Sequence, residues 1–319
     1  MNDNTSKIAA VEELIKSKNP SKRAVSQELE EILFELLPVL DKGFIRVIDY
    51  MGNDAAITQA ARVSYGKGTK TVQNDKALIN YLIRHGHTSP FEMCEIKFHI
   101  KAPIFVARQW VRHRTANINE YSARYSLVEN EFYVPKKEQI MGQSSNNKQG
   151  RSATLAEPFN EEALNQIKNI SKTAFLTYEK LLNLNNSNSD NKINNDSQKE
   201  GLARELARIV LPLNAYTEFY WKIDLHNLLH FLFLRVHPHA QYEIRVYAQT
   251  MLDILKKWVP LVFDAFTNYK QKSIHLSKEG HRVINDMLTQ GSINKANYNL
   301  STREWLELQE QFNIKIKNS

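Results

Sequence analysis

The sequence predicts an α+β protein with a mixed sheet, because short strands are scattered among long helical segments. Residues 94–101 alternate apolar and polar side chains at every position, which is typical of a half-buried strand. Residues 44–50 and 215–223 also have strand character. Helices are expected over 54–63, 73–86, 103–113, 157–183, 199–211, 224–236, 240–258 and 260–270.

The patterned segments indicate one central domain with an extension at each end. We expect an N-terminal extension over 1–40 that becomes helical at 24–37, a single α+β domain over 41–275, and a C-terminal extension with short helices over 276–319. In the last of these, Ser301 and Glu304 have the spacing of a capping box.

Two polar segments interrupt the central domain. Residues 142–153 are rich in serine, asparagine and glycine and predict a loop. Residues 183–198 contain seven asparagines together with serine and aspartate. Such a composition cannot bury a core, so we expect a flexible insertion between two helices.

Composition indicates a globular chain of 319 residues, 42% hydrophobic and 24% charged. No apolar run approaches the length of a membrane span, and a single cysteine favours a reducing cytoplasm. The net charge of +7 is consistent with anionic partners, and charge alone leaves nucleic acid and small phosphorylated metabolites both open. The basic residues are dispersed and form no recognised nucleic-acid motif, which argues against nucleic acid.

The most informative segment is 108–125, where four arginines and one histidine accompany a single acid, Glu120. Like charges near a core cost desolvation energy and repel one another, so such a cluster indicates a bound anion with several oxygens. On a helix over 103–113, we expect an inward face of Ile104, Ala107, Trp110 and Val111 and a polar face of Arg108, Gln109, Arg112 and His113. Glu120, Ser122 and Arg124 alternate, so an extended segment over 120–127 would point them the same way.

Several residues suggest other chemistry but favour plainer interpretations. Cys94 occupies an apolar position of its strand and is expected to be inert core. Ser122 lacks the Gly-x-Ser-x-Gly turn of a serine nucleophile. His226 and His230 have a spacing that could bind zinc, but no convincing third ligand accompanies them, so no metal is expected. No GxGxxG motif follows a strand, so a Rossmann site is not indicated.

One long motif resembles a known family. Arg112-His113-Arg114, followed after seven residues by Ser122, resembles the signature of the flavin-dependent thymidylate synthases, and Asn119-Glu120 and Arg124-Tyr125 match as well. The similarity extends over roughly residues 43–270 through the segments 61–65, 87–92, 211–216 and 234–241.

The resemblance implies a methyltransferase that converts deoxyuridylate (dUMP) to thymidylate (dTMP). The one-carbon unit would come from methylenetetrahydrofolate and the hydride from NADPH through FAD. It also implies a homotetramer whose sites form between subunits. The implied dUMP ligands are Gln109, Arg112, Glu120, Ser122, Arg124, Arg208 and Arg235, of which Arg235 would act catalytically on the base. The implied FAD ligands are Ser64, His87, Ser89, Arg112, His113, Arg114, Glu120, Asp224, His226 and His230.

Overall fold

The computed structural model describes residues 22–63, 74–145, 150–184, 201–312 and 314. It divides into two compact units, Met1–Gln271 and Lys272–Ser319, each of which is treated by itself below. Ser64 and most of the asparagine-rich insertion lie outside the described residues. Within those ranges, no helix combines the length and the apolar character that crossing a membrane requires.

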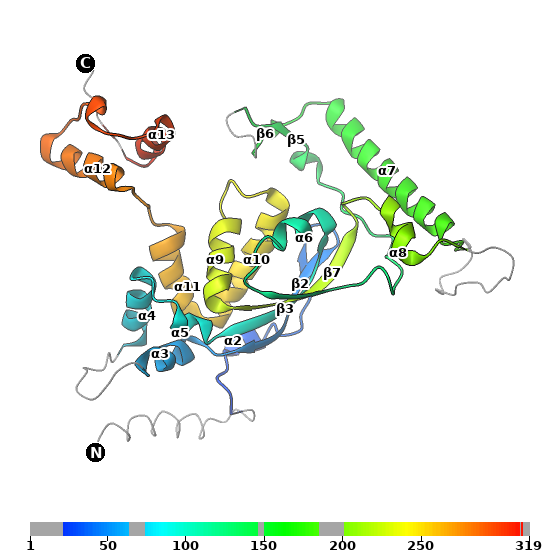
Figure 1. Ribbon diagram of the computed structural model, residues 1–319, viewed down its shortest axis with the longest axis horizontal. Helices are drawn as coiled ribbons and strands as arrows, with labels where there is room; N and C mark the ends of the chain where they lie inside the picture. Colours follow the sequence, from blue (N-terminus) through cyan, green and yellow to red (C-terminus); the bar gives the residue numbers. More distant parts are fainter. Residues whose placement is uncertain (1–21, 64–73, 146–149, 185–200, 313, 315–319) are drawn as a thin grey trace. The chain divides into compact units, whose positions relative to one another are not determined.

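A curved antiparallel sheet forms the centre of the larger unit (Figure 1). Its strands in spatial order are β1 (Leu37–Val39), β2 (Gly43–Met51), β3 (Glu95–Pro103), β7 (Tyr216–Asp224) and β4 (Asn117–Glu120). A separate hairpin pairs β5 (Met141–Gln143) with β6 (Arg151–Thr154). The α+β class is confirmed, with the correction that the pairings among the described strands are antiparallel rather than mixed.

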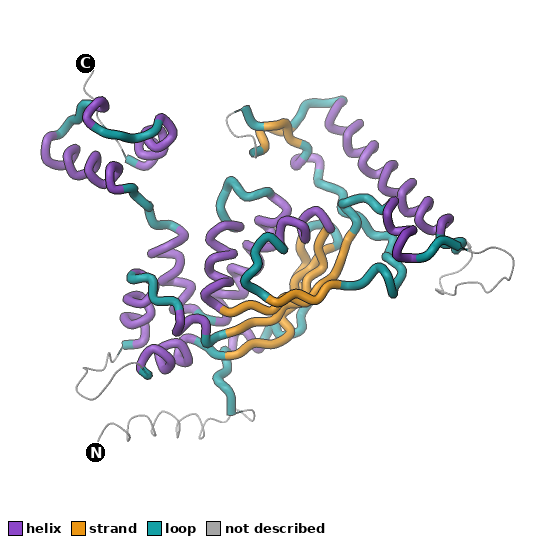
Figure 2. The backbone as a smooth tube through the Cα atoms, viewed as in Figure 1, coloured by secondary structure: helices purple, strands orange, loops and turns teal. Residues whose placement is uncertain are grey.

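Helices α9 and α10 cover one face of this sheet (Figures 1 and 2). The α-helices of the larger unit are α2 (Gln27–Glu30), α3 (Asp54–Arg62), α4 (Asp75–Arg84), α5 (Ser89–Glu92), α6 (Ile104–Trp110), α7 (Phe159–Leu181), α8 (Arg204–Ala207), α9 (Leu225–Arg235), α10 (Tyr242–Trp258) and α11 (Pro260–Phe266). Shorter helical turns are η1 (Lys137–Gln139), η2 (Arg208–Val210) and the π-helical η3 (Thr267–Gln271).

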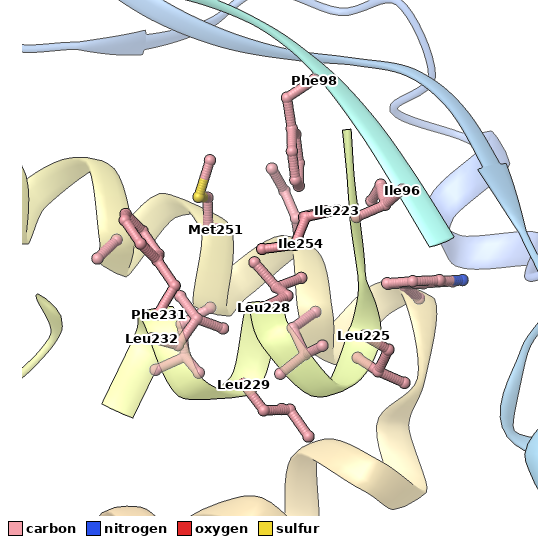
Figure 3. Packing of buried hydrophobic residues seen from close by; sticks show 14 of the residues in the cluster. Ile96, Phe98, Ile223, Leu225, Leu228, Leu229, Phe231, Leu232, Met251 and Ile254 are labelled. Atoms are coloured by element: carbon pink, nitrogen blue, oxygen red, sulfur yellow. The ribbon is translucent and has the colours of Figure 1, made fainter. Parts of the chain in front are cut away.

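The main core lies between the sheet and these two helices. Apolar residues of β3 and β7, such as Phe98 and Ile223, meet Leu228 of α9 and Ile254 of α10 (Figure 3). Alternate residues along β3 are buried, as the alternating sequence predicts. The helix α9 begins where expected, because the Asp224 side chain accepts a hydrogen bond from the backbone N–H of Asn227 at 2.9 Å.

Cys94 is confirmed as inert core. Its side chain is fully buried, and burial raises the pKa of the thiol to about 12. The neighbouring Gly52 has a φ of +85°, and a Cβ there would lie 2.4 Å from the Cys94 sulfur. Only glycine fits at this close approach. Because the thiol is buried and its pKa is raised, it is not available as a nucleophile.

Four expected elements are corrected by the structure. The helix over 199–211 shortens to α8, followed by the turn η2. The helix over 24–37 shortens to α2, because Phe34 adopts a positive φ of 66° and the chain then enters β1. The polar loop at 142–153 contains much of the β5–β6 hairpin. The extended segment over 120–127 ends as a strand at Glu120, and the chain turns back at Ser122, whose carbonyl accepts from two following N–H groups. Ser122 and Arg124 therefore do not alternate along a strand.

The smaller unit consists of α12 (Lys278–Gln290), η4 (Lys295–Asn297) and α13 (Thr302–Gln311) around its own apolar cluster. Val283 and Trp305 lie at the centre of this cluster. Gly291 ends α12 in the left-handed conformation with a φ of 75°. The capping box at Ser301 and Glu304 is confirmed, so the local signals of the sequence determine where α13 begins.

Candidate functional site

Helix α6 leads into the basic cluster, and Trp110 anchors the helix in the core. The Trp110 ring is fully buried and contacts Phe219 and Trp221 of β7 and Phe231 of α9. The helix ends at this residue, which leaves Arg112 exposed and His113 half-buried in the turn that follows. The expected inward face is confirmed at Ala107 and Trp110 but is wrong at Val111, which is 37% exposed because the helix has already ended.

His113 packs its ring against side chains of β7 and α9. Its centroid lies 6.1 Å from Trp221 and 5.6 Å from Phe231, and the ring of His230 is 5.8 Å away. Burial lowers the pKa of His113, and the nearby His230 and Arg235 lower it further, against the opposing effect of Asp224. The imidazole is therefore kept neutral at physiological pH, where it can donate one hydrogen bond and accept another.

Arg235 is the last residue of α9, and its guanidinium is partly withdrawn from water. Burial lowers its pKa, and its Nε atom is buried without a hydrogen-bond partner among the described residues. Gln109 of α6 has a buried Oε1 atom in the same condition. An unpaired buried donor or acceptor costs about 1–3 kcal/mol, so each of these two atoms favours a polar ligand beside it.

Arg124 and Arg208 both contact Glu205 of α8. The Arg124 guanidinium forms an ion pair with the Glu205 carboxylate at 3.1 Å, and Arg208 Nε donates to the Glu205 backbone carbonyl at 3.2 Å. Arg204 donates to the carbonyl of Tyr125 and holds the turn that carries Arg124. Two exposed arginines from segments distant in the sequence therefore share one neighbouring residue.

Glu120 is fixed from the neighbouring strand, although it is exposed. Thr217 of β7 donates from its hydroxyl to Glu120 Oε1 at 2.8 Å. Thr217 was not among the residues that the sequence singled out. The sequence pattern could have indicated it. Positions 217, 219, 221 and 223 lie on the same, buried face of β7, and Thr217 is the one polar residue among these four.

The other expected FAD ligands lie around the start of α9. Helix α5 carries Ser89 and packs against α9, and the His87 ring stacks on Tyr81 at 5.8 Å. Asp224 and His226 stand at the first turn of α9. Arg112 and Arg114 have no ion-pair partner within the described ranges, which leaves both guanidinium groups available to an anion.

Groups of three or more metal-ligating side chains are absent from the part of the chain that the structure describes.

An open pocket is lined by other residues. It has a volume of about 570 Å³ and is bordered by Arg23, Tyr50, Met51, Met93 and Lys222, and its lining includes none of the expected ligands. Arg112, Arg114, Glu120 and Arg124 are instead exposed. The described part of one chain therefore presents its expected ligands mostly on an open surface.

Comparison with known proteins identifies the family. The family model described as "Thymidylate synthase complementing protein" matches residues 46–261. A flavin-dependent thymidylate synthase of Wolbachia pipientis wMel is 55% identical over 288 residues, covering 90% of this chain and 96% of that protein. Its counterpart in Rickettsia bellii (strain RML369-C) is 56% identical over 291 residues, covering 91% and 98%.

A solved structure agrees with this result. The UMP/dUMP methylase PolB of Streptomyces cacaoi, bound with 5-Br UMP, superposes with a TM-score of 0.62 at 31% identity, covering 75% of this chain and 100% of that one. The sequence motif at 112–125, the antiparallel fold and these similarities all lead to one conclusion: this chain belongs to the thymidylate synthase complementing protein family, whose members include the flavin-dependent thymidylate synthases.

Proposed function

We propose that this protein is a flavin-dependent thymidylate synthase, which methylates dUMP to dTMP with methylenetetrahydrofolate as the carbon donor and NADPH as the reductant. The observation that carries the proposal is Arg235, a partly buried guanidinium with an unpaired Nε beside the neutral ring of His113. A cation held in this way stabilises negative charge that develops on a pyrimidine base during reaction.

The other residues place the nucleotide. Arg124 and Arg208 both contact Glu205 and suit the phosphate, because a guanidinium offers paired donors to phosphate oxygens. Gln109 offers an unpaired carbonyl oxygen, and Glu120 offers the carboxylate oxygen that Thr217 leaves free. The proposed dUMP ligands are Gln109, Arg112, Glu120, Ser122, Arg124, Arg208 and Arg235.

The donor set also fits FAD without a nucleotide-binding fold. Arg112 and Arg114 form no ion pair within the described part of the chain and suit a diphosphate. The residues proposed to complete the flavin site are Ser64, His87, Ser89, His113, Glu120, Asp224, His226 and His230. When bound and reduced by NADPH, FAD supplies the hydride that completes the methyl group. The chain's own contribution is to hold the base, the phosphate and the carbon donor in the reactive orientation and to exclude water from them.

We also propose that a homotetramer completes the site. The exposure of Arg112, Arg114, Glu120 and Arg124 supports this, because charged ligands of a small nucleotide are normally enclosed on several sides. A second chain facing this surface would supply the missing walls. The site would then be formed between subunits.

The protein as purified is expected to be yellow, with the absorption spectrum of oxidised flavin. Anaerobic addition of NADPH is expected to bleach the flavin band, because the proposed reaction draws its hydride from this nucleotide. A spectrophotometer under nitrogen is sufficient for the measurement. A colourless protein that binds no added FAD would contradict the proposed function.

Replacing Arg124 by alanine is expected to weaken dUMP binding about tenfold or more, because one charge-assisted contact to the phosphate is lost. Isothermal titration of the FAD-loaded protein measures the affinity. Arg303→Ala is the matched control, since Arg303 is an exposed arginine in the smaller unit, 82% accessible, and pairs only along its own helix. An affinity that Arg124→Ala leaves unchanged would refute the assignment of Arg124.

A further inference from the structure

Thr217 is a hydroxyl placed among core side chains. It is 8% exposed and shares the inner face of β7 with Phe219, Trp221 and Ile223. A buried hydroxyl needs a hydrogen-bond partner, and an apolar residue would fill such a position at lower cost. Its partner is Glu120, and the 2.8 Å distance from Thr217 Oγ1 to Glu120 Oε1 is typical of a good O–H···O bond.

The direction of this bond is determined by the chemistry of the two groups. An ionised carboxylate can only accept, so the threonine hydroxyl must donate. The bond occupies Oε1 and leaves Oε2 of Glu120 without a protein donor among the described residues. The carboxylate is thus held by one oxygen and presents the other.

Glu120 needs such a support because of where it stands. Strand β4 is four residues long, lies at the edge of the sheet and is exposed throughout. Glu120 is its last residue and pairs with Phe219, so Thr217 is its diagonal neighbour on the same face of β7. After Glu120 one further backbone bond, from the Tyr121 N–H to the Glu218 carbonyl at 2.8 Å, joins the chain to β7 before it turns at Ser122. Without Thr217, a flexible side chain at the end of a short edge strand would be free to change rotamer.

We propose that Thr217 is a positioning residue for ligand binding, which orients the Glu120 carboxylate before dUMP arrives. This inference rests on the proposed function, because it takes Glu120 to be a nucleotide ligand. Holding the carboxylate in advance removes the entropy loss of ordering that side chain when the nucleotide binds. Thr217 itself touches no substrate and acts only through Glu120.

The test compares Thr217→Val, which keeps the shape and β-branching but removes the hydroxyl, with Thr217→Ser, which keeps the hydroxyl. Titration of dUMP into the FAD-loaded variants is expected to show affinity reduced roughly five- to tenfold for valine and restored to within about twofold for serine. Thr217→Ala provides a second hydroxyl-free variant in case the valine protein does not fold. Thermal unfolding of each variant separates a loss of affinity from a loss of stability.

A double-mutant cycle with Glu120→Ala, which removes the acceptor of the Thr217 hydroxyl, identifies the route of the effect. If Thr217 acts through the Glu120 carboxylate, Thr217→Val adds little to the loss that Glu120→Ala already causes. Full additivity of the two losses, or hydroxyl-free variants that bind dUMP as the wild type does, would overturn the positioning role alone. A wild-type protein that binds FAD but no dUMP would remove the proposed function, and the positioning role with it.

Discussion

We expect Arg235→Ala to lower the rate of methyl transfer at saturating dUMP by about 10²–10³-fold while FAD stays bound. The magnitude is that of removing one preorganised group that stabilises charge in a transition state. The guanidinium is partly desolvated, which strengthens its effect on a nearby developing charge. Its Nε has no protein partner among the described residues, so its donor capacity is open to the substrate.

Two comparisons make the Arg235 result specific. Arg235→Lys keeps the charge but loses the planar fork, so it should recover only part of the rate. Single-turnover measurements with reduced enzyme separate the chemical step from dUMP binding, and the visible spectrum reports bound flavin. An Arg235→Ala protein that purifies without FAD and regains normal turnover when FAD is added would show that Arg235 holds the flavin instead.

Glu243→Ala is expected to lower the free energy of unfolding of the larger unit by about 3 kcal/mol. The Glu243 carboxylate is 3% exposed and accepts from Arg151 at 2.6 and 2.7 Å, from Gln241 at 2.9 Å and from Tyr133 at 3.3 Å. Removing one partner of a buried ion pair costs about 3–5 kcal/mol, and the lower end applies because Arg151 is one-third exposed and can be hydrated. The same carboxylate joins the β5–β6 hairpin to the start of α10.

Urea unfolding followed by circular dichroism measures this effect, and the transition of the larger unit must be separated from that of the smaller one. Glu243→Gln keeps the size and an acceptor oxygen, so it should lose less than alanine. Arg151→Ala should lose at least as much, because it leaves a carboxylate that is 3% exposed without its cation, supported by the neutral Gln241 and Tyr133 donors. An ordinary surface substitution changes the free energy of unfolding by about 0.5 kcal/mol or less. A change this small in Glu243→Ala would contradict the stabilising role of the Glu243 carboxylate.

Local patterns in the sequence predicted the elements that local chemistry determines. The alternation at 94–101 gave β3, Asp224 gave the start of α9, and Ser301 with Glu304 gave the start of α13. The apolar position of Cys94 in its strand correctly indicated an inert thiol. The helical periodicity also predicted correctly that Trp110 faces the core. The basic residues of the motif follow at the end of this helix.

Contacts between segments that are distant in the sequence could not be predicted from these local patterns. Glu243 and Arg151 are 92 residues apart, and Thr217 and Glu120 are 97 residues apart, so neither pair leaves a periodic signal. The turn at Ser122 was also missed, because an alternating polar pattern is equally compatible with a strand and with a loop. Arg124 reaches its neighbours through this turn and an ion pair to Glu205, which one-dimensional spacing cannot reveal.

A crystal structure of the FAD-loaded protein soaked with dUMP tests the central claim most directly. The account predicts the phosphate within hydrogen-bonding distance of Arg124 and Arg208, the pyrimidine ring at Arg235, and a second chain closing the site. A nucleotide bound elsewhere, with these three arginines directed into bulk solvent even in the assembled protein, would contradict it.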